Sequence, residues 1–108
     1  MIVRLGLVET AVQKFAFDTS RLADVCHNHA VTSVGVFGSM VRGEATEQSD
    51  IDLLVEFGER KSLLDLVKLE RELSTALGRK VDLLTKDAIS PYLRERILGE
   101  VQTIYETR

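Results

Sequence analysis

Two short apolar runs separated by a polar stretch stand out in the middle of the chain. The first covers residues 31–37 and the second covers residues 50–57. Both have the length of strands, and both are rich in the β-branched and aromatic residues that strands favour. Gly38-Ser39 ends the first run, and residues 40–47 are expected to form a short helix. The pattern therefore predicts a strand, a small-residue turn, a short helix and a second strand.

Capping residues and helical spacing account for most of the remaining chain. Asp18, Ser62 and Ser90 each precede a segment whose apolar residues recur at helical spacing. The expected elements are a helix from 18 to about 29, a helix from 62 to 77, a strand over 81–85, a helix from 90 to about 99 and a short edge strand over 101–105. The buried stripe of helix 62–77 is expected to comprise Leu63, Leu66, Val67, Leu73 and Leu77, and that of the last helix Leu93, Ile97 and Leu98. This alternation of strands and helices indicates an α/β fold.

Residues 1–17 are expected to be an N-terminal extension to a single domain over residues 18–108. Apolar residues recur in this extension at the spacing of an amphipathic helix, namely Leu7, Val8, Ala11, Val12 and Phe15. Such a helix can pack on the domain, mediate self-association or have no role.

Asp50 and Asp52 stand at the start of the second predicted strand, with Ile51 between them. Because side chains alternate along a strand, the two carboxylates are expected to project to the same side. Neighbouring carboxylates raise each other's pKa unless a cation compensates, and hard oxygen ligands suit Mg²⁺ or Mn²⁺. The alternative is a pair of solvated acids in the turn that opens a strand.

The Gly38-Ser39 turn upstream favours the metal interpretation. Glycine lets a backbone approach a phosphate closely, and Ser39 offers a hydroxyl and an N–H group. The Gly-Lys-Ser/Thr of a Walker A loop is absent. Arg42 either holds the turn through hydrogen bonds to Asp50 or to the backbone, or contacts phosphate. A phosphate-binding turn beside paired carboxylates predicts that the protein handles a nucleoside triphosphate.

Gly38-Ser39 with Arg42-Gly43, followed by Ser49-Asp50-Ile51-Asp52, resembles the signature of the DNA polymerase β-like nucleotidyltransferase superfamily. The surrounding sequence, over about residues 22–105, is similar to its minimal nucleotidyltransferases of MntA type. The resemblance implies a nucleotidyltransferase fold, with a small mixed sheet flanked by helices. It also implies a third carboxylate on a neighbouring strand, and the matching residue is Asp82. Otherwise Asp82 is a structural acid in a short strand.

The resemblance further implies transfer of AMP from ATP to a hydroxyl, with release of pyrophosphate. Asp50, Asp52 and Asp82 are then the catalytic and metal-binding residues, holding one or two Mg²⁺ ions that Mn²⁺ can replace. The implied nucleotide-binding residues are Gly38, Ser39, Arg42 and Ser49. The implied partner is a HEPN-domain toxin encoded nearby, whose tyrosine accepts AMP in a type VII toxin–antitoxin system.

Two other functions remain open at this point. The first is a non-catalytic antitoxin or binding subunit that neutralises its partner by contact. The second is a nucleotidyltransferase whose acceptor is a small molecule or a nucleic acid. Larger relatives that modify antibiotics or RNA carry an additional domain that helps form the acceptor site, and the predicted catalytic core accounts for most of this chain.

Composition limits which partners the protein can bind and which cellular compartment it fits. The net charge of −3 gives no basic field that would attract nucleic acid, so strong nucleic acid binding is not expected. Cys26 is the single cysteine, which excludes an internal disulfide and fits a reducing compartment. No apolar run approaches the roughly 18–20 residues that span a bilayer, and the first residues lack a signal-peptide layout. We therefore expect a cytoplasmic protein with no membrane contact, and leave homo- or hetero-oligomers open.

Overall fold

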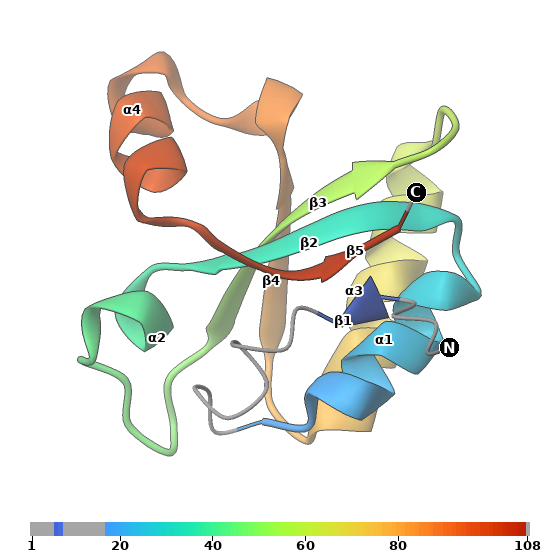
Figure 1. Cartoon of the computed structure of the whole chain (residues 1–108), viewed down its shortest axis with the longest axis horizontal. Coiled ribbons are helices and arrows are strands. Elements are labelled where there is room, and N and C mark those ends of the chain that lie inside the picture. The colour runs from blue at the N-terminus through green and yellow to red at the C-terminus, as the bar shows by residue number, and fades with distance from the viewer. Residues whose placement is uncertain (1–5, 8–16, 108) are drawn as a thin grey trace, which may run out of the picture.

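The computed structural model of the chain describes residues 6–7 and 17–107 (Figure 1). Its elements are β1 (Gly6–Leu7), α1 (Thr19–His27), β2 (Val31–Phe37), α2 (Ser39–Arg42), β3 (Ile51–Phe57), α3 (Leu63–Leu77), β4 (Val81–Thr85), the 3₁₀ helix η2 (Lys86–Ala88), α4 (Pro91–Glu100) and β5 (Gln102–Glu106). None of the helices in the described part is long and apolar enough to cross a membrane.

The strands form one mixed sheet in the order β1-β5-β2-β3-β4. β3 and β4 are parallel and are connected by α3, whereas the other neighbours are antiparallel. The predicted α/β fold with a small mixed sheet flanked by helices is confirmed. The placement of the last strand at an edge is wrong, because β5 lies between β2 and the two-residue strand β1.

Two other boundaries differ from the sequence prediction. The helix expected over residues 40–47 is the single turn α2, which ends where Gly43 adopts a left-handed conformation with φ 75°. The helix expected within residues 1–17 falls mostly outside the described residues. Its described part includes Gly6–Leu7, which pair with β5 as a strand.

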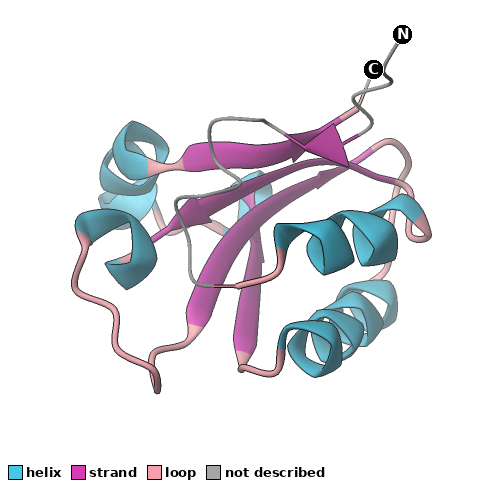
Figure 2. Ribbon diagram, turned by 60° about the horizontal axis from the view of Figure 1, so that its bottom comes forward, coloured by secondary structure: helices cyan, strands magenta, loops and turns pink. Residues whose placement is uncertain are grey.

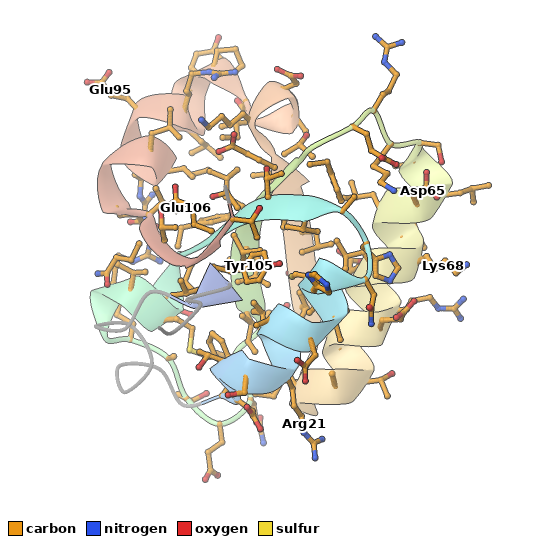
Figure 3. The ribbon with its side chains drawn as sticks, turned by 45° about the vertical axis from the view of Figure 1, so that its right-hand side comes forward. Arg21, Asp65, Lys68, Glu95, Tyr105 and Glu106 are labelled. Carbon is orange, nitrogen blue, oxygen red and sulfur yellow. The ribbon has the colours of Figure 1, made fainter. Side chains whose placement is uncertain are left out.

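α1 and α3 cover one face of the sheet and form the main core with it (Figure 2). Asp18 and Ser62 cap α1 and α3 as predicted, and Asp65 completes a capping box with Ser62. Alternate residues of β3 point into this core: Ile51, Leu53 and Val55. Arg21 and Lys68 project from the outer sides of these two helices (Figure 3).

The buried stripe of α3 agrees with the prediction at Leu66, Leu73 and Leu77, which lie in or against the main core, and differs at Leu63 and Val67. Leu69 and Leu73 are buried, whereas the exposed fractions of Leu63, Leu64 and Val67 are 75%, 79% and 43%. The reason is that α1 and the sheet cover only the later turns of α3, and no sequence periodicity reports where a neighbouring element stops.

The opposite face of the sheet is covered much less. Leu54, Ile89 and Ile97 form a small second core there, with Phe37, Leu84 and Val101 packed against it. Of the three α4 residues that were expected to be buried, only Ile97 is buried, while Leu93 and Leu98 are exposed. At the beginnings of β3 and β4, the side chains on this face, Asp52 and Asp82, are only partly buried.

Side chains of α3 accept hydrogen bonds from the backbone N–H groups along the outer edge of β4. The N–H of Val81 donates to Ser74 Oγ at 3.0 Å, and the N–H of Leu83 donates to Glu70 Oε2 at 2.9 Å. An edge strand with free N–H groups invites pairing with another chain. These two contacts block that pairing along β4.

We predict that Glu70→Ala lowers the free energy of unfolding by about 1–3 kcal/mol, because it leaves the Leu83 N–H without its acceptor. Glu70→Gln keeps an acceptor oxygen and should cost less. The neighbouring exposed Arg71 provides the control, and Arg71→Ala should stay within about 0.5 kcal/mol. Urea unfolding measures all three; equal midpoints for the two alanine variants would contradict the prediction.

Cys26 should react with a thiol reagent only when the protein unfolds. The side chain is fully buried, and burial raises the pKa of its thiol to about 12. At pH 8 the native protein therefore holds almost no thiolate, which is the reactive form. We expect DTNB to label the native protein slowly, at a rate limited by unfolding that exposes the thiol. In guanidinium chloride the reaction should be immediate. Rapid stoichiometric labelling of the folded protein would contradict the prediction, because it would show that the face of α1 that carries Cys26 is accessible to solvent.

Candidate active site

A strained turn joins β2 to α2. Gly38 has φ 78° and ψ −149°, a conformation that residues with a Cβ rarely adopt. A Cβ at this position would collide with Oδ2 of Asp52. Glycine is therefore required both by the backbone and by the neighbouring carboxylate. The turn and Asp52 form one packed unit.

Strand register brings the predicted carboxylates together. Asp52 lies opposite Phe37 of β2 and in register with Asp82 of β4. Asp50 directly precedes β3, and Asp52 alternates with the buried residues Ile51 and Leu53, so it faces away from the main core. The three side chains gather at the open end of the thinly covered sheet face. Their predicted proximity follows from the parallel pairing of β3 and β4.

The cluster carries more negative charge than its neighbours neutralise. Burial, followed by the charges of Asp82 and Asp50, raises the pKa of Asp52. Burial is also the largest cause that raises the pKa of Asp82, and Asp50 adds to it while Lys80 opposes it. Lys80 Nζ is 3.8 Å from Asp50 Oδ2 and 4.0 Å from Asp82 Oδ1, with 70% of its side chain exposed. At that exposure its compensation is weak.

The donor set fits a hard divalent cation, since it consists of carboxylate oxygens under mutual repulsion. As the side chains stand, no group of three acidic, histidine or cysteine residues in the described part of the chain is arranged to hold a metal ion. The carboxylates are thus near one another without forming a finished coordination shell. Metal binding by Asp50, Asp52 and Asp82 stays a prediction.

Arg42 makes contacts that neither sequence interpretation named. Its Nε donates to Glu44 Oε1 at 3.0 Å, and its Nη1 donates to both carboxylate oxygens of Glu100 at 3.2 Å. Glu100 also accepts the N–H of Gly38 at 2.6 Å. Arg42 therefore holds the turn through acidic side chains. Glu100 was missed by the sequence prediction because it lies 58 residues after Arg42 and belongs to no local pattern.

Arg79, two residues before β4, holds the loop between α2 and Asp50. Nη2 of Arg79 donates to the carbonyl oxygens of Thr46 and Ser49 at 2.6 Å and 2.7 Å. Ser49 Oγ accepts the N–H of Thr46 at 2.8 Å. Ser49 thus shapes the loop, and nucleotide binding by its hydroxyl stays a prediction. By contrast, the Ser39 hydroxyl has no hydrogen-bond partner among the described residues, which leaves it available to a ligand.

Two other titratable side chains pair with residues outside the carboxylate cluster. Glu56, on the same strand face as Asp52, is 3.3 Å from Lys86 Nζ, in an ion pair away from the turn. His29 Nε2 lies 3.0 Å from Glu72 Oε2, also remote from the carboxylates.

Comparison with known proteins adds independent information. Residues 21–104 match the family described as the nucleotidyltransferase domain. A Methanocaldococcus jannaschii protein, provisionally named protein adenylyltransferase MJ0435, is 51% identical over 74% of this chain and 86% of its own length. The protein adenylyltransferase MntA of Thermococcus cleftensis is 42% identical over 77% of this chain and 84% of its own length.

Solved structures agree with these matches. One described provisionally as a minimal nucleotidyltransferase is 43% identical, with a TM-score of 0.66, over 78% of this chain and 88% of its own. The MNT antitoxin complex with a tri-AMPylated HEPN toxin of Shewanella oneidensis gives a TM-score of 0.63 over 82% of this chain and 69% of the other. At 19% identity it supports the fold alone. By family match, sequence identity and fold, the chain belongs to the nucleotidyltransferase domain family, among the minimal nucleotidyltransferases of MntA type.

Proposed function

We propose that this protein transfers AMP from ATP to a hydroxyl group of a partner protein. The observation that carries the proposal is the register of Asp52 with Asp82 beside the Gly38-Ser39 turn. It gathers acidic side chains next to a backbone turn with a free hydroxyl. Relatives named protein adenylyltransferases share 42–51% of the aligned residues, which supports this choice among nucleotidyl transfers.

Each residue has a task in this reaction. The hydroxyl and N–H of Ser39 bind the phosphates that leave as pyrophosphate. Asp50, Asp52 and Asp82 would hold Mg²⁺, which would supply charge neutralisation at the triphosphate and lower the pKa of the acceptor hydroxyl. The acceptor oxygen attacks the α-phosphorus, and the bond from that phosphorus to the bridging oxygen breaks. Asp82 takes the hydroxyl proton. Such transfer depends mainly on positioning and charge.

We further propose that the acceptor is a tyrosine of a HEPN-domain toxin encoded beside this protein, which makes this protein an antitoxin. An MNT antitoxin of the same fold occurs in complex with a tri-AMPylated HEPN toxin, and the proposed pairing follows that example. The −3 net charge also favours a protein acceptor over a nucleic acid.

We predict that Asp50→Asn and Asp52→Asn each lower the rate of AMP transfer at least about 100-fold, since each removes a charge that the triphosphate site needs. The measurement is the intact mass of the neighbouring HEPN protein after incubation with ATP and Mg²⁺. The wild-type protein should add one or more AMP units, and peptide mapping should place them on tyrosine. Asp87→Asn, on η2, is the matched control. A stable complex with no mass gain from the wild-type protein would instead support neutralisation by contact.

Removal of divalent metal should stop the same transfer. We expect no AMP incorporation in excess EDTA and recovery on addition of Mg²⁺ or Mn²⁺, because carboxylate oxygens accept both ions. Calorimetric titration of the isolated protein with Mn²⁺ gives a second readout, and Asp52→Asn should weaken that binding. Full activity in EDTA would contradict metal dependence.

A further inference from the structure

Glu100 lies at the end of α4 and reaches the turn that precedes α2. Its Oε2 accepts the Gly38 N–H at 2.6 Å, and both of its oxygens accept from Nη1 of Arg42 at 3.2 Å. Its side chain is 16% exposed, against 63% for Glu44, the other carboxylate on Arg42. A shielded carboxylate that forms charge-assisted hydrogen bonds is held more firmly than an exposed one.

The position of Glu100 follows from the end of the β2–β5 ladder. The last backbone pairs are Gly35 with Thr103 and Val36 with Gln102. Beyond them β5 gives way to α4, so its backbone no longer provides an acceptor for Gly38. The Glu100 carboxylate takes that place. On the other strand edge, β3 places Asp52 against Gly38. Gly38 is therefore held between Glu100 and Asp52.

We propose that Glu100 is a positioning residue for nucleotidyl transfer, which fixes the Gly38-Ser39 turn against Asp52 by holding the Gly38 N–H and Arg42. The inference rests on the proposed function and assigns one further residue to it. With the turn fixed, Ser39 and Asp52 present their oxygens to the same triphosphate. With Glu100 removed, the turn loses its anchor and Arg42 keeps only the exposed Glu44.

The contrary interpretation is that Glu100 occupies the place of a phosphate and must leave when ATP binds. The geometry opposes it, because two separate donors hold Glu100: the N–H of Gly38 in the turn and Nη1 of Arg42 at the end of α2. Displacement would leave a shielded carboxylate without partners, which is costly. The two interpretations predict opposite changes in ATP affinity when Glu100 is replaced.

The test compares Glu100→Ala, Glu100→Gln and the control Glu95→Gln. Glu95 lies on the same helix and points away from the molecule (Figure 3). Two readouts are needed: the affinity for mant-ATP, and the initial rate of AMP incorporation into the neighbouring HEPN protein as a function of ATP concentration. Thermal unfolding of each variant shows whether it is folded at the assay temperature.

We expect Glu100→Ala to weaken mant-ATP binding, to raise the KM for ATP and to lower kcat/KM about 10- to 100-fold, because small displacements of reacting groups are costly. Glu100→Gln should recover part of the loss, since its amide oxygen can still accept the Gly38 N–H. Glu95→Gln should match the wild type. Tighter mant-ATP binding by either Glu100 variant would overturn the proposal in favour of displacement, and unchanged affinity and KM in a folded variant would overturn it outright.

The two readouts separate this inference from the proposed function. A wild-type protein that binds mant-ATP but transfers no AMP would refute the proposed transfer, while weaker binding by Glu100→Ala would still support the anchoring role. A double-mutant cycle covers the case in which Glu100→Ala does not fold. In an Arg42→Gln background, Glu100→Gln should cost markedly less than in the wild type. Additive effects would overturn the coupling through Arg42.

Discussion

The parallel pairing of β3 with β4 is the constraint on which the site depends. It sets Asp52 beside Asp82 on one face and places Ile51 beside Val81 on the other. Because a strand alternates faces at every residue, the same register that buries the apolar partners exposes the acidic ones. A slip of one residue would bury carboxylates in the main core. Burial of Ile51, Leu53 and Val81 therefore fixes the geometry of the carboxylates as firmly as it fixes the fold.

The two faces of the sheet are covered unequally by helices, and this difference makes the carboxylates accessible to a ligand. α1 and α3 form the main core with one face, whereas α4 contributes only Ile97 to the small core on the other (Figures 1 and 2). The carboxylates thus sit at the boundary between protein and solvent, where partial burial raises the pKa of Asp52 and Asp82 while a ligand can still reach them. The flanking segments are held by long-range contacts, with Glu100 on the turn and Arg79 on the loop.

Much of the fold and the acidic part of the site could be predicted from the sequence. The strands, the caps at Asp18 and Ser62 and the shared face of Asp50 and Asp52 depend on neighbours within about four residues, and such patterns are visible along the chain. Asp82 could be named only through family resemblance, since its partner Asp52 is 30 residues away. The exposed beginning of α3 and the inner position of β5 were mispredicted, because both depend on where other elements stop.

What the sequence determined by itself is the set of elements and the chemistry they carry: strand, glycine turn, paired carboxylates, capped helices and a single unpaired cysteine. What only the tertiary structure decided is which distant groups hold that chemistry in place. Glu100, Arg79 and Glu70 look like ordinary surface charges in the sequence, yet each binds backbone atoms of another segment. Hydrogen bonds between remote segments follow from packing and register, which leave no local spacing for a sequence pattern to reveal.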